Sequence, residues 1–137
     1  MNSKIKPFKI TQKFDEAARR NFAETIFNEL RELTADTVGV SRQSYGPGEQ
    51  EAMELIARYA EEEGLEVDWD SAANLVVSLP GKARTHPSIF CGSHLDSVPH
   101  GGNFDGAAGV IAGLMALIQI NRSGLDPVVP TKLIALD

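Results

Sequence analysis

Apolar side chains recur at three- and four-residue steps in two early stretches of the chain, with charged residues between them. This pattern predicts two amphipathic helices, at residues 14–33 and 49–63. The segment between them is rich in turn-forming residues, and Gly46, Pro47 and Gly48 are expected to exclude helix there. Gly64 follows the second stretch and is predicted to cap its end.

Shorter apolar runs follow and predict strands. Residues 65–69 and 75–79 indicate a hairpin or two neighbouring strands, and residues 88–93 and 131–136 indicate two more. Residues 106–120 are apolar on nearly every side, which predicts a buried helix too short to span a bilayer. Because a strand, a crossover helix and a strand form a βαβ unit, the last two strands should be parallel neighbours. The expected fold is α/β, with a mixed sheet of about four strands and helices on its faces.

Composition narrows the classes of partner. With 137 residues and 42% apolar content, the chain is one domain with enough side chains for a core. The formal charge is -6 and Lys and Arg form no stripe, which argues against nucleic acid and anionic membranes as partners. No apolar run follows the first lysines, so we expect neither a signal peptide nor a membrane anchor, and cytoplasmic residence is the default. The lone Cys91 is interpreted as a small buried hydrophobe rather than a reactive thiol.

The candidate chemistry lies between the 88–93 strand and the helix after it. His94 and Asp96 follow the strand, where open α/β sheets bind ligands, and Asp105 precedes the helix. An imidazole and a carboxylate that approach one point offer a ligand pair that zinc, manganese and cobalt accept. Asp105 has two oxygens and is suited to bridge two metals roughly 3.5–4 Å apart. Asp96 is placed to accept the other ring N–H of His94 and fix its tautomer.

Each of these residues also has a structural interpretation. Asp105 is a good N-cap for the following helix, worth about 1 kcal/mol without any metal. Asp96 is suited to an Asx-type turn with the backbone that follows it, and His94 to a hydrogen-bonded place at the rim of the core. His100 is open as a ligand, a substrate contact or a solvated loop residue, the last two being favoured, and His86 is interpreted as a surface residue.

The stretch GSHLDSVPHGGNFDGAAGV, residues 92–110, resembles the signature of the hydantoinase/carbamoylase amidohydrolases, a branch of the dinuclear-metal aminoacylase and peptidase superfamily. The segments GVSRQSYGPGE, EEGLEVDWDSAANLVVSLPG and TKLIAL agree with it, in the order in which such proteins carry them. Only ten residues, 95–104, separate His94 from Asp105, whereas the peptidase branches carry a longer insertion.

The resemblance implies a three-layer sandwich and a role for each candidate residue. His94 would bind one of two divalent ions (Zn, Mn or Co), Asp105 would bridge both, and Asp96 would orient His94. The implied function is metal-dependent hydrolysis of the C–N bond of N-carbamoyl amino acids, ureido acids or related linear amides. The substrate is a small molecule, and the complete enzyme is expected to be a homodimer. A dipeptidase or N-deacylase of the same superfamily is the nearest alternative.

The chain departs from the family pattern after TKLIAL, where such proteins continue with a pair of glutamates. Residues 106–137 contain no Glu and no His. We therefore expect residues 1–137 to be the N-terminal part of a catalytic domain, without a lid or dimerisation domain, and to be inactive alone. Glu49, Glu51 and His100 are candidates for the missing ligands, but no spacing favours them.

A further alternative is a non-catalytic, truncated module that binds metal or associates with itself. In that case residues 131–136 are expected to form an exposed apolar sheet edge, which strand exchange or self-association would cover.

Overall fold

The computed structural model describes residues 14–137, which form three helices and one four-stranded sheet. The first residues, on which the expectation of no signal peptide rests, lie outside this described part. Helix α1 (Glu16–Thr34) begins after Asp15, whose side chain accepts a hydrogen bond from the backbone N of Ala18 at 2.9 Å. Helix α3 (Ala107–Ser123) ends at Gly124, which has the left-handed conformation common after a helix. Both helices confirm the pattern-based prediction.

Helix α2 (Pro47–Glu62) begins inside the segment that was expected to exclude helix. Gly46 is its N-cap residue and Pro47 occupies its first turn. Proline is tolerated there because the first helical N–H has no partner within the helix and because the ring presets φ. The expectation was wrong about this boundary, since proline breaks the interior of a helix rather than its start. Gly64, the predicted cap, has a φ of 77° but lies one position after the observed C-cap residue, Glu63.

The strands β1 (Glu66–Trp69), β2 (Leu75–Ser78), β3 (Ile89–His94) and β4 (Thr131–Leu136) form one sheet in the order β1-β2-β4-β3. The β1–β2 and β2–β4 pairs are antiparallel, and the β3–β4 pair is parallel. The predicted hairpin, the parallel neighbours and the mixed sheet are therefore confirmed.

Strand β4 lies inside the sheet, paired with β2 on one side and β3 on the other. The expectation that residues 131–136 form an exposed edge was therefore wrong. Hydrophobic pattern gave no sign that the hairpin would place β2 against β4. The edge strands are β1 and β3 instead.

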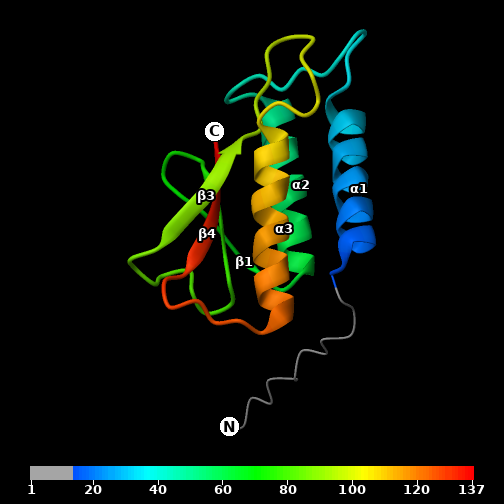
Figure 1. The fold of residues 1–137 in the computed structure, drawn as a ribbon. Helices are drawn as coiled ribbons and strands as arrows, with labels where there is room; N and C mark the ends of the chain where they lie inside the picture. The colour runs from blue at the N-terminus through cyan, green and yellow to red at the C-terminus, as the bar shows by residue number, and fades with distance from the viewer. Residues whose placement is uncertain (1–13) are drawn as a thin grey trace, which may run out of the picture.

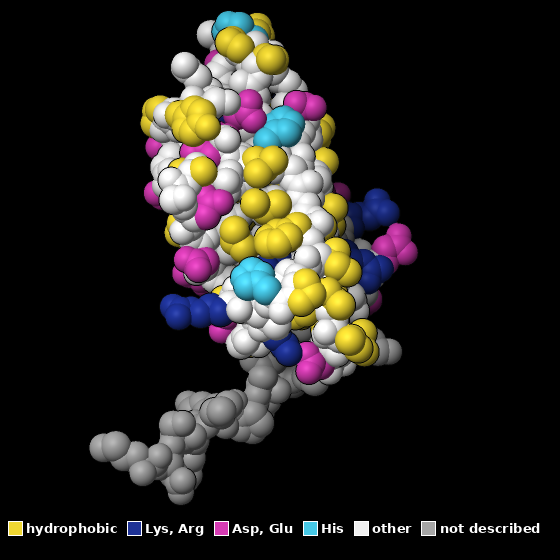
Figure 2. Space-filling view, turned by 90° about the vertical axis from the view of Figure 1, so that its left-hand side faces the viewer, with side chains coloured by type: hydrophobic (Ala, Val, Ile, Leu, Met, Phe, Trp, Pro, Cys, Tyr) yellow, Lys and Arg dark blue, Asp and Glu magenta, His cyan; other side chains and the backbone are white. Residues whose placement is uncertain are grey.

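All three helices cover the same face of the sheet (Figure 1). No helix of residues 14–137 covers the opposite face, where hydrophobic side chains gather (Figure 2). Phe90 is 50% exposed on this face, and Lys132 is buried beside it with its ammonium donating to the carbonyl of Ala83 at 2.7 Å. The α/β class is confirmed, and these residues supply two layers of the expected sandwich.

Helix α3 packs closely on the parallel strands because it presents glycines to them. A Cβ atom added at Gly109 would lie 2.7 Å from the Cβ of Ser93. One added at Gly113 would lie 2.7 Å from a methyl of Leu133 and 3.4 Å from the sulfur of Cys91. Among residues 14–137, none of the helices is both long and apolar enough to cross a bilayer.

A larger side chain at Gly113 should force α3 away from β4. We expect Gly113→Val to lower the free energy of unfolding by about 2 kcal/mol, the usual cost of overpacking a core. Ala112→Val, at an exposed position of the same helix, is the control and should cost less than about 0.7 kcal/mol. Urea unfolding followed by circular dichroism measures both, and equal losses would contradict the close approach.

Candidate metal centre

The candidate site lies at the carboxyl end of the parallel strand pair. His94 is the last residue of β3 and is paired with Leu136, the last residue of β4. The chain then leaves the sheet, and residues 95–106 form the loop that leads into α3. Strand, loop and helix therefore bring the predicted side chains to one end of the sheet, as the sequence indicated.

His94 and Asp96 are in direct contact. The Nδ1 atom of His94 lies 2.8 Å from Oδ1 of Asp96 and 3.2 Å from its backbone oxygen. The other carboxylate oxygen of Asp96 accepts a hydrogen bond from Ser44 Oγ at 3.0 Å. The ring tautomer that suits these contacts carries its proton on Nδ1 and leaves the lone pair of Nε2 free. The predicted orienting contact of Asp96 is therefore present in the geometry.

Asp105 approaches the other side of the same ring. Its Oδ2 lies 3.9 Å from His94 Nε2, and its side chain is 78% exposed. It is not the N-cap of α3, because Gly106 holds that position and no side chain caps the helix. The Asx-turn interpretation of Asp96 also lacks support, because the N–H of Ser97 donates to the carbonyl of Arg42 at 2.7 Å. The structure therefore supports neither the N-cap interpretation of Asp105 nor the Asx-turn interpretation of Asp96.

Gly106 allows this approach of loop and ring. Its φ is 66°, a conformation that favours glycine. A Cβ atom there would lie 2.5 Å from Nδ1 and from Cε1 of the His94 ring, and closer still to the His94 carbonyl oxygen. Any side chain at this position would push the ring away from Asp105.

Arg42, which the sequence analysis did not identify, holds the loop between β3 and α3 in place from the interior of the protein. It is fully buried, and its Nε donates to the carbonyl of Leu95 at 2.6 Å. Its terminal nitrogens donate to the side-chain and backbone oxygens of Asn103 at 3.0 and 3.2 Å, and more weakly to Thr34 Oγ1 at 3.4 Å. One guanidinium thus binds both ends of the 95–103 segment. Nothing in a turn-rich stretch marks such an arginine, because its partners are 53 and 61 residues away.

The charge of Arg42 also acts on the site. Burial lowers the pKa of its guanidinium, while the carboxylates of Asp96 and Asp105 act in the opposite direction.

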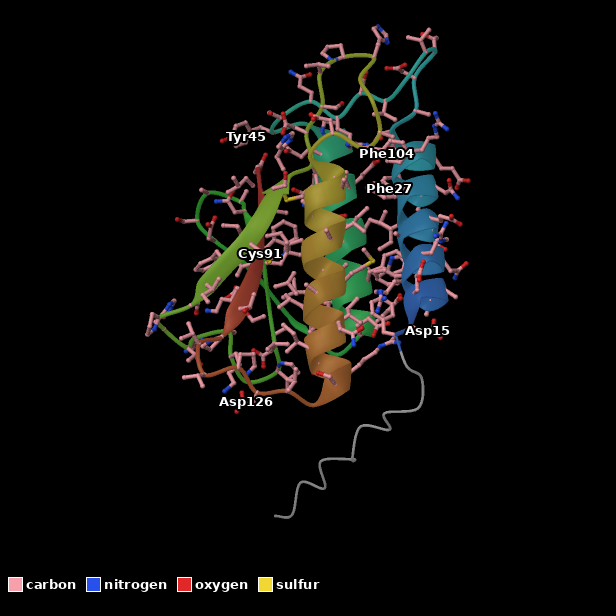
Figure 3. The ribbon with its side chains drawn as sticks, in the orientation of Figure 1. Asp15, Phe27, Tyr45, Cys91, Phe104 and Asp126 are labelled. Carbon is pink, nitrogen blue, oxygen red and sulfur yellow. The ribbon has the colours of Figure 1, made fainter. Side chains whose placement is uncertain are left out.

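The other end of the loop is fastened to α1. Asn103 Nδ2 donates to the carbonyl of Phe27 at 2.8 Å, and the ring of Phe104 packs edge-on against Phe27 with centroids 4.8 Å apart (Figure 3). His100 Nδ1 lies 2.9 Å from Oδ2 of Asp36, in the turn after α1. His100 is itself exposed. Of its three interpretations, this contact between two loops agrees with that of a solvated loop residue.

The remaining candidates lie apart from this pair. Glu51 and His86 are exposed, and Glu49 is buried at the start of α2. In residues 14–137 no group of three or more His, Cys, Asp or Glu side chains is arranged to hold a metal ion. Cys91 is half-buried beneath α3, and burial raises the pKa of its thiol, which suits the interpretation as a small hydrophobe.

The sequence and the fold of this chain were compared with those of known proteins. No protein-family model matches the chain. It is 39% identical over 97 residues to an N-carbamoyl-L-amino acid amidohydrolase of Geobacillus stearothermophilus, a match that covers 71% of this chain and 24% of that protein. An allantoate amidohydrolase of Bacillus subtilis is 34% identical over 62% of this chain and 21% of that protein. Among solved structures, an amidase of the hydantoinase/carbamoylase family from Burkholderia multivorans superimposes with a TM-score of 0.75 at 28% identity, over 85% of this chain and 28% of that one.

The chain is related in sequence and fold to the hydantoinase/carbamoylase amidohydrolases. This confirms the resemblance that residues 92–110 indicated. The match is partial from the relatives' side, because the chain spans about a quarter of the length of the curated relatives it matches.

Removing the guanidinium of Arg42 should release the loop. We expect Arg42→Leu to lower the free energy of unfolding by about 3 kcal/mol, because it leaves several buried acceptors without a donor. Arg58→Leu, which removes a half-exposed ion pair with Glu29, is the matched control and should cost about 1 kcal/mol or less. Urea unfolding measures both, and an Arg42 variant as stable as the control would show that the loop is held by other contacts.

Proposed function

We propose that this chain supplies the first residues of a dinuclear metal site in an amidohydrolase. The reaction is hydrolysis of the C–N bond of N-carbamoyl amino acids, ureido acids or related linear amides. The observation that carries this proposal is the convergence of His94 Nε2 and Asp105 Oδ2, 3.9 Å apart, on a chain related to carbamoyl amidohydrolases.

The two side chains fit a metal by their chemistry. A separation of 3.9 Å is shorter than the sum of two ordinary zinc–ligand distances, about 2.0–2.2 Å each, so one cation can contact both atoms. The free Nε2 lone pair and the exposed carboxylate are the donor types that zinc, manganese and cobalt accept. The pair is only part of a coordination shell, and the remaining ligands would come from residues outside this stretch.

In this proposal each residue has a distinct task. His94 binds through Nε2, and Asp96 holds the ring by Nδ1 and makes it a stronger ligand. Asp105 would help to hold both ions, since its carboxylate has two oxygens. Divalent ions at such a site supply electrophilic assistance for attack of water on the carbamoyl or amide carbon. Arg42 and Gly106 keep the loop in the conformation that brings these groups together.

The proposal extends to partners. We expect a small-molecule substrate, two divalent ions, a homodimer as the complete enzyme and a cytoplasmic location. Neither nucleic acid nor a membrane surface is expected to bind, in keeping with the net charge of -6.

One observation favours a second candidate, self-association of the chain. Strand β3 is a sheet edge with Ile89 57% and Phe90 50% exposed, and an edge of this kind invites pairing with another chain. Sedimentation equilibrium tests it: a monomer at high concentration counts against self-association.

Metal binding tests the two ligands directly. Titration calorimetry with MnCl₂ and ZnCl₂ should show that His94→Ala and Asp105→Asn each weaken binding by at least about tenfold. Asp96→Asn should weaken binding by about 10–100-fold because the charged acceptor of the His94 ring N–H becomes a neutral amide. His86→Ala is the control and should bind as the unaltered chain does. Equal affinity in the His94 and His86 variants would remove the metal site from this place.

Activity tests the reaction. With N-carbamoyl amino acids and added manganese or zinc, we expect turnover by a longer protein that continues past Asp137 and none by the 137-residue chain. In the longer protein, His94→Ala should abolish turnover while His86→Ala leaves it unchanged. Turnover by the 137-residue chain would show that its own residues suffice, and cleavage of dipeptides instead would favour the peptidase alternative.

A further inference from the structure

A second pair of carboxyl groups lies near the candidate site and takes no part in it. Glu49 is in the first turn of α2 and only 1% exposed. Its Oε2 accepts a hydrogen bond from the backbone N of Tyr45 at 2.8 Å. The same N–H also lies 3.2 Å from Oδ1 of Asp137, the residue that follows β4. Two carboxyl groups therefore share one donor.

The other oxygen of Glu49 has no partner. Its Oε1 is buried and accepts no hydrogen bond from any described residue. None of the ion pairs formed by residues 14–137 includes Glu49 or Asp137. Arg42, the basic residue nearest to Glu49 in sequence, directs its guanidinium to Leu95 and Asn103, and Lys132, the one nearest to Asp137, donates to the carbonyl of Ala83. A second negative charge here would be uncompensated, and a buried charge of this kind is costly.

A proton on Glu49 resolves both difficulties. We propose that Glu49 is a positioning residue that carries a proton and donates a hydrogen bond from Oε1 to Asp137, tying the start of α2 to the chain that leaves β4. The proton gives the orphan oxygen a partner and reduces two facing charges to one. This pairing stands independently of the proposed hydrolytic function.

The pair lies where it affects the candidate site. Asp137 directly follows Leu136, the register partner of His94, and its backbone N donates to Asn74 Oδ1 at 3.0 Å. A cavity of about 290 Å³ borders Tyr45 and both carboxyl groups, so the proton can exchange with solvent. Tyr45 lies beside the end of the sheet (Figure 3). Holding Asp137 therefore fixes the residue that directly follows β4, next to the register partner of His94.

The electrostatics agree with this geometry. Burial and then the hydrogen bond with Asp137 raise the pKa of Glu49 to about 7, and the charges of Asp137 and Asp96 act in the same direction. The N–H of Tyr45 opposes the shift. Because the pKa in the folded state lies above the ordinary value of 4.5, the folded chain keeps a proton that the unfolded chain releases. This stabilisation is complete below about pH 4.5 and is lost as the pH rises through about 7.

Titration of the Glu49 carboxyl in the 137-residue chain is the direct test. Carbon-13 NMR of glutamate carboxyl groups, with Glu49→Gln to assign the signal, should give a midpoint near pH 7. Asp137→Asn removes the facing charge and should lower the midpoint. A midpoint near the ordinary value in the unaltered chain would overturn the proposal, whatever the variants do.

The stability of variants and the backbone signals of Asp137 test whether Glu49 positions Asp137 or only fills space. Between about pH 5 and 8 the unfolding constant of the unaltered chain should rise on the order of 100-fold more than that of Glu49→Gln. The amide introduced by this substitution can accept from Tyr45 and donate to Asp137, so the variant should keep the backbone signals of Asp137 in place at both ends of the range. Glu49→Met, similar in size, should displace them.

The control is Glu51→Gln, an exposed carboxylate on the same helix. It should keep the full pH dependence of the unaltered chain. If Glu49→Gln and Glu51→Gln respond to pH alike, or if Glu49→Met leaves the Asp137 signals unmoved, Glu49 carries no proton-dependent contact.

Discussion

The conformation of the loop between β3 and α3 depends on one buried guanidinium. A loop of irregular backbone at the end of a sheet has no ladder to satisfy its carbonyls, and those that are buried need another donor. Arg42 supplies it, because its planar group donates in several directions at once and bonds Leu95 and Asn103 together. The surrounding backbone adds a short pairing between Val40 and Gly101. The segment that carries Asp96 and leads to Asp105 is thereby fixed relative to β3.

The geometry at His94 follows from two further constraints. Parallel pairing with β4 sets where β3 ends, and His94, which carries the imidazole, is the last residue of that strand. Gly106 then turns the chain against the ring with a backbone that a side chain would obstruct. Because Asp96 engages Nδ1, the ring cannot rotate without losing that contact, and Nε2 remains directed toward Asp105. The fold therefore sets the positions of the imidazole and the carboxylate relative to each other.

Much of this could be predicted from the sequence because its signals are local. The three- and four-residue apolar steps fix α1 and α2, and the run through Val110 and Leu117 marks α3 as buried. His94, Asp96 and Asp105 lie within twelve residues, so a strand, a loop and a helix bring them together. The central place of β4 and the role of Arg42 could not be predicted this way, since each depends on contacts between segments far apart in the chain. Pro47 misled for another reason: its effect depends on whether it falls in the interior or the first turn of a helix.

The carboxyl groups at this end of the sheet differ in how their charge is accommodated. The charges of Asp96 and Asp105 interact favourably with the buried cation of Arg42, and Asp105 is largely open to solvent. Glu49 is buried, is held by a single shared N–H and faces Asp137, so the least costly way to remove its charge is to keep a proton. The same sheet end thus separates carboxylates suited to a divalent cation from a carboxyl suited to donate a hydrogen bond. Burial and the position of one arginine, rather than residue type, decide which role each acid takes.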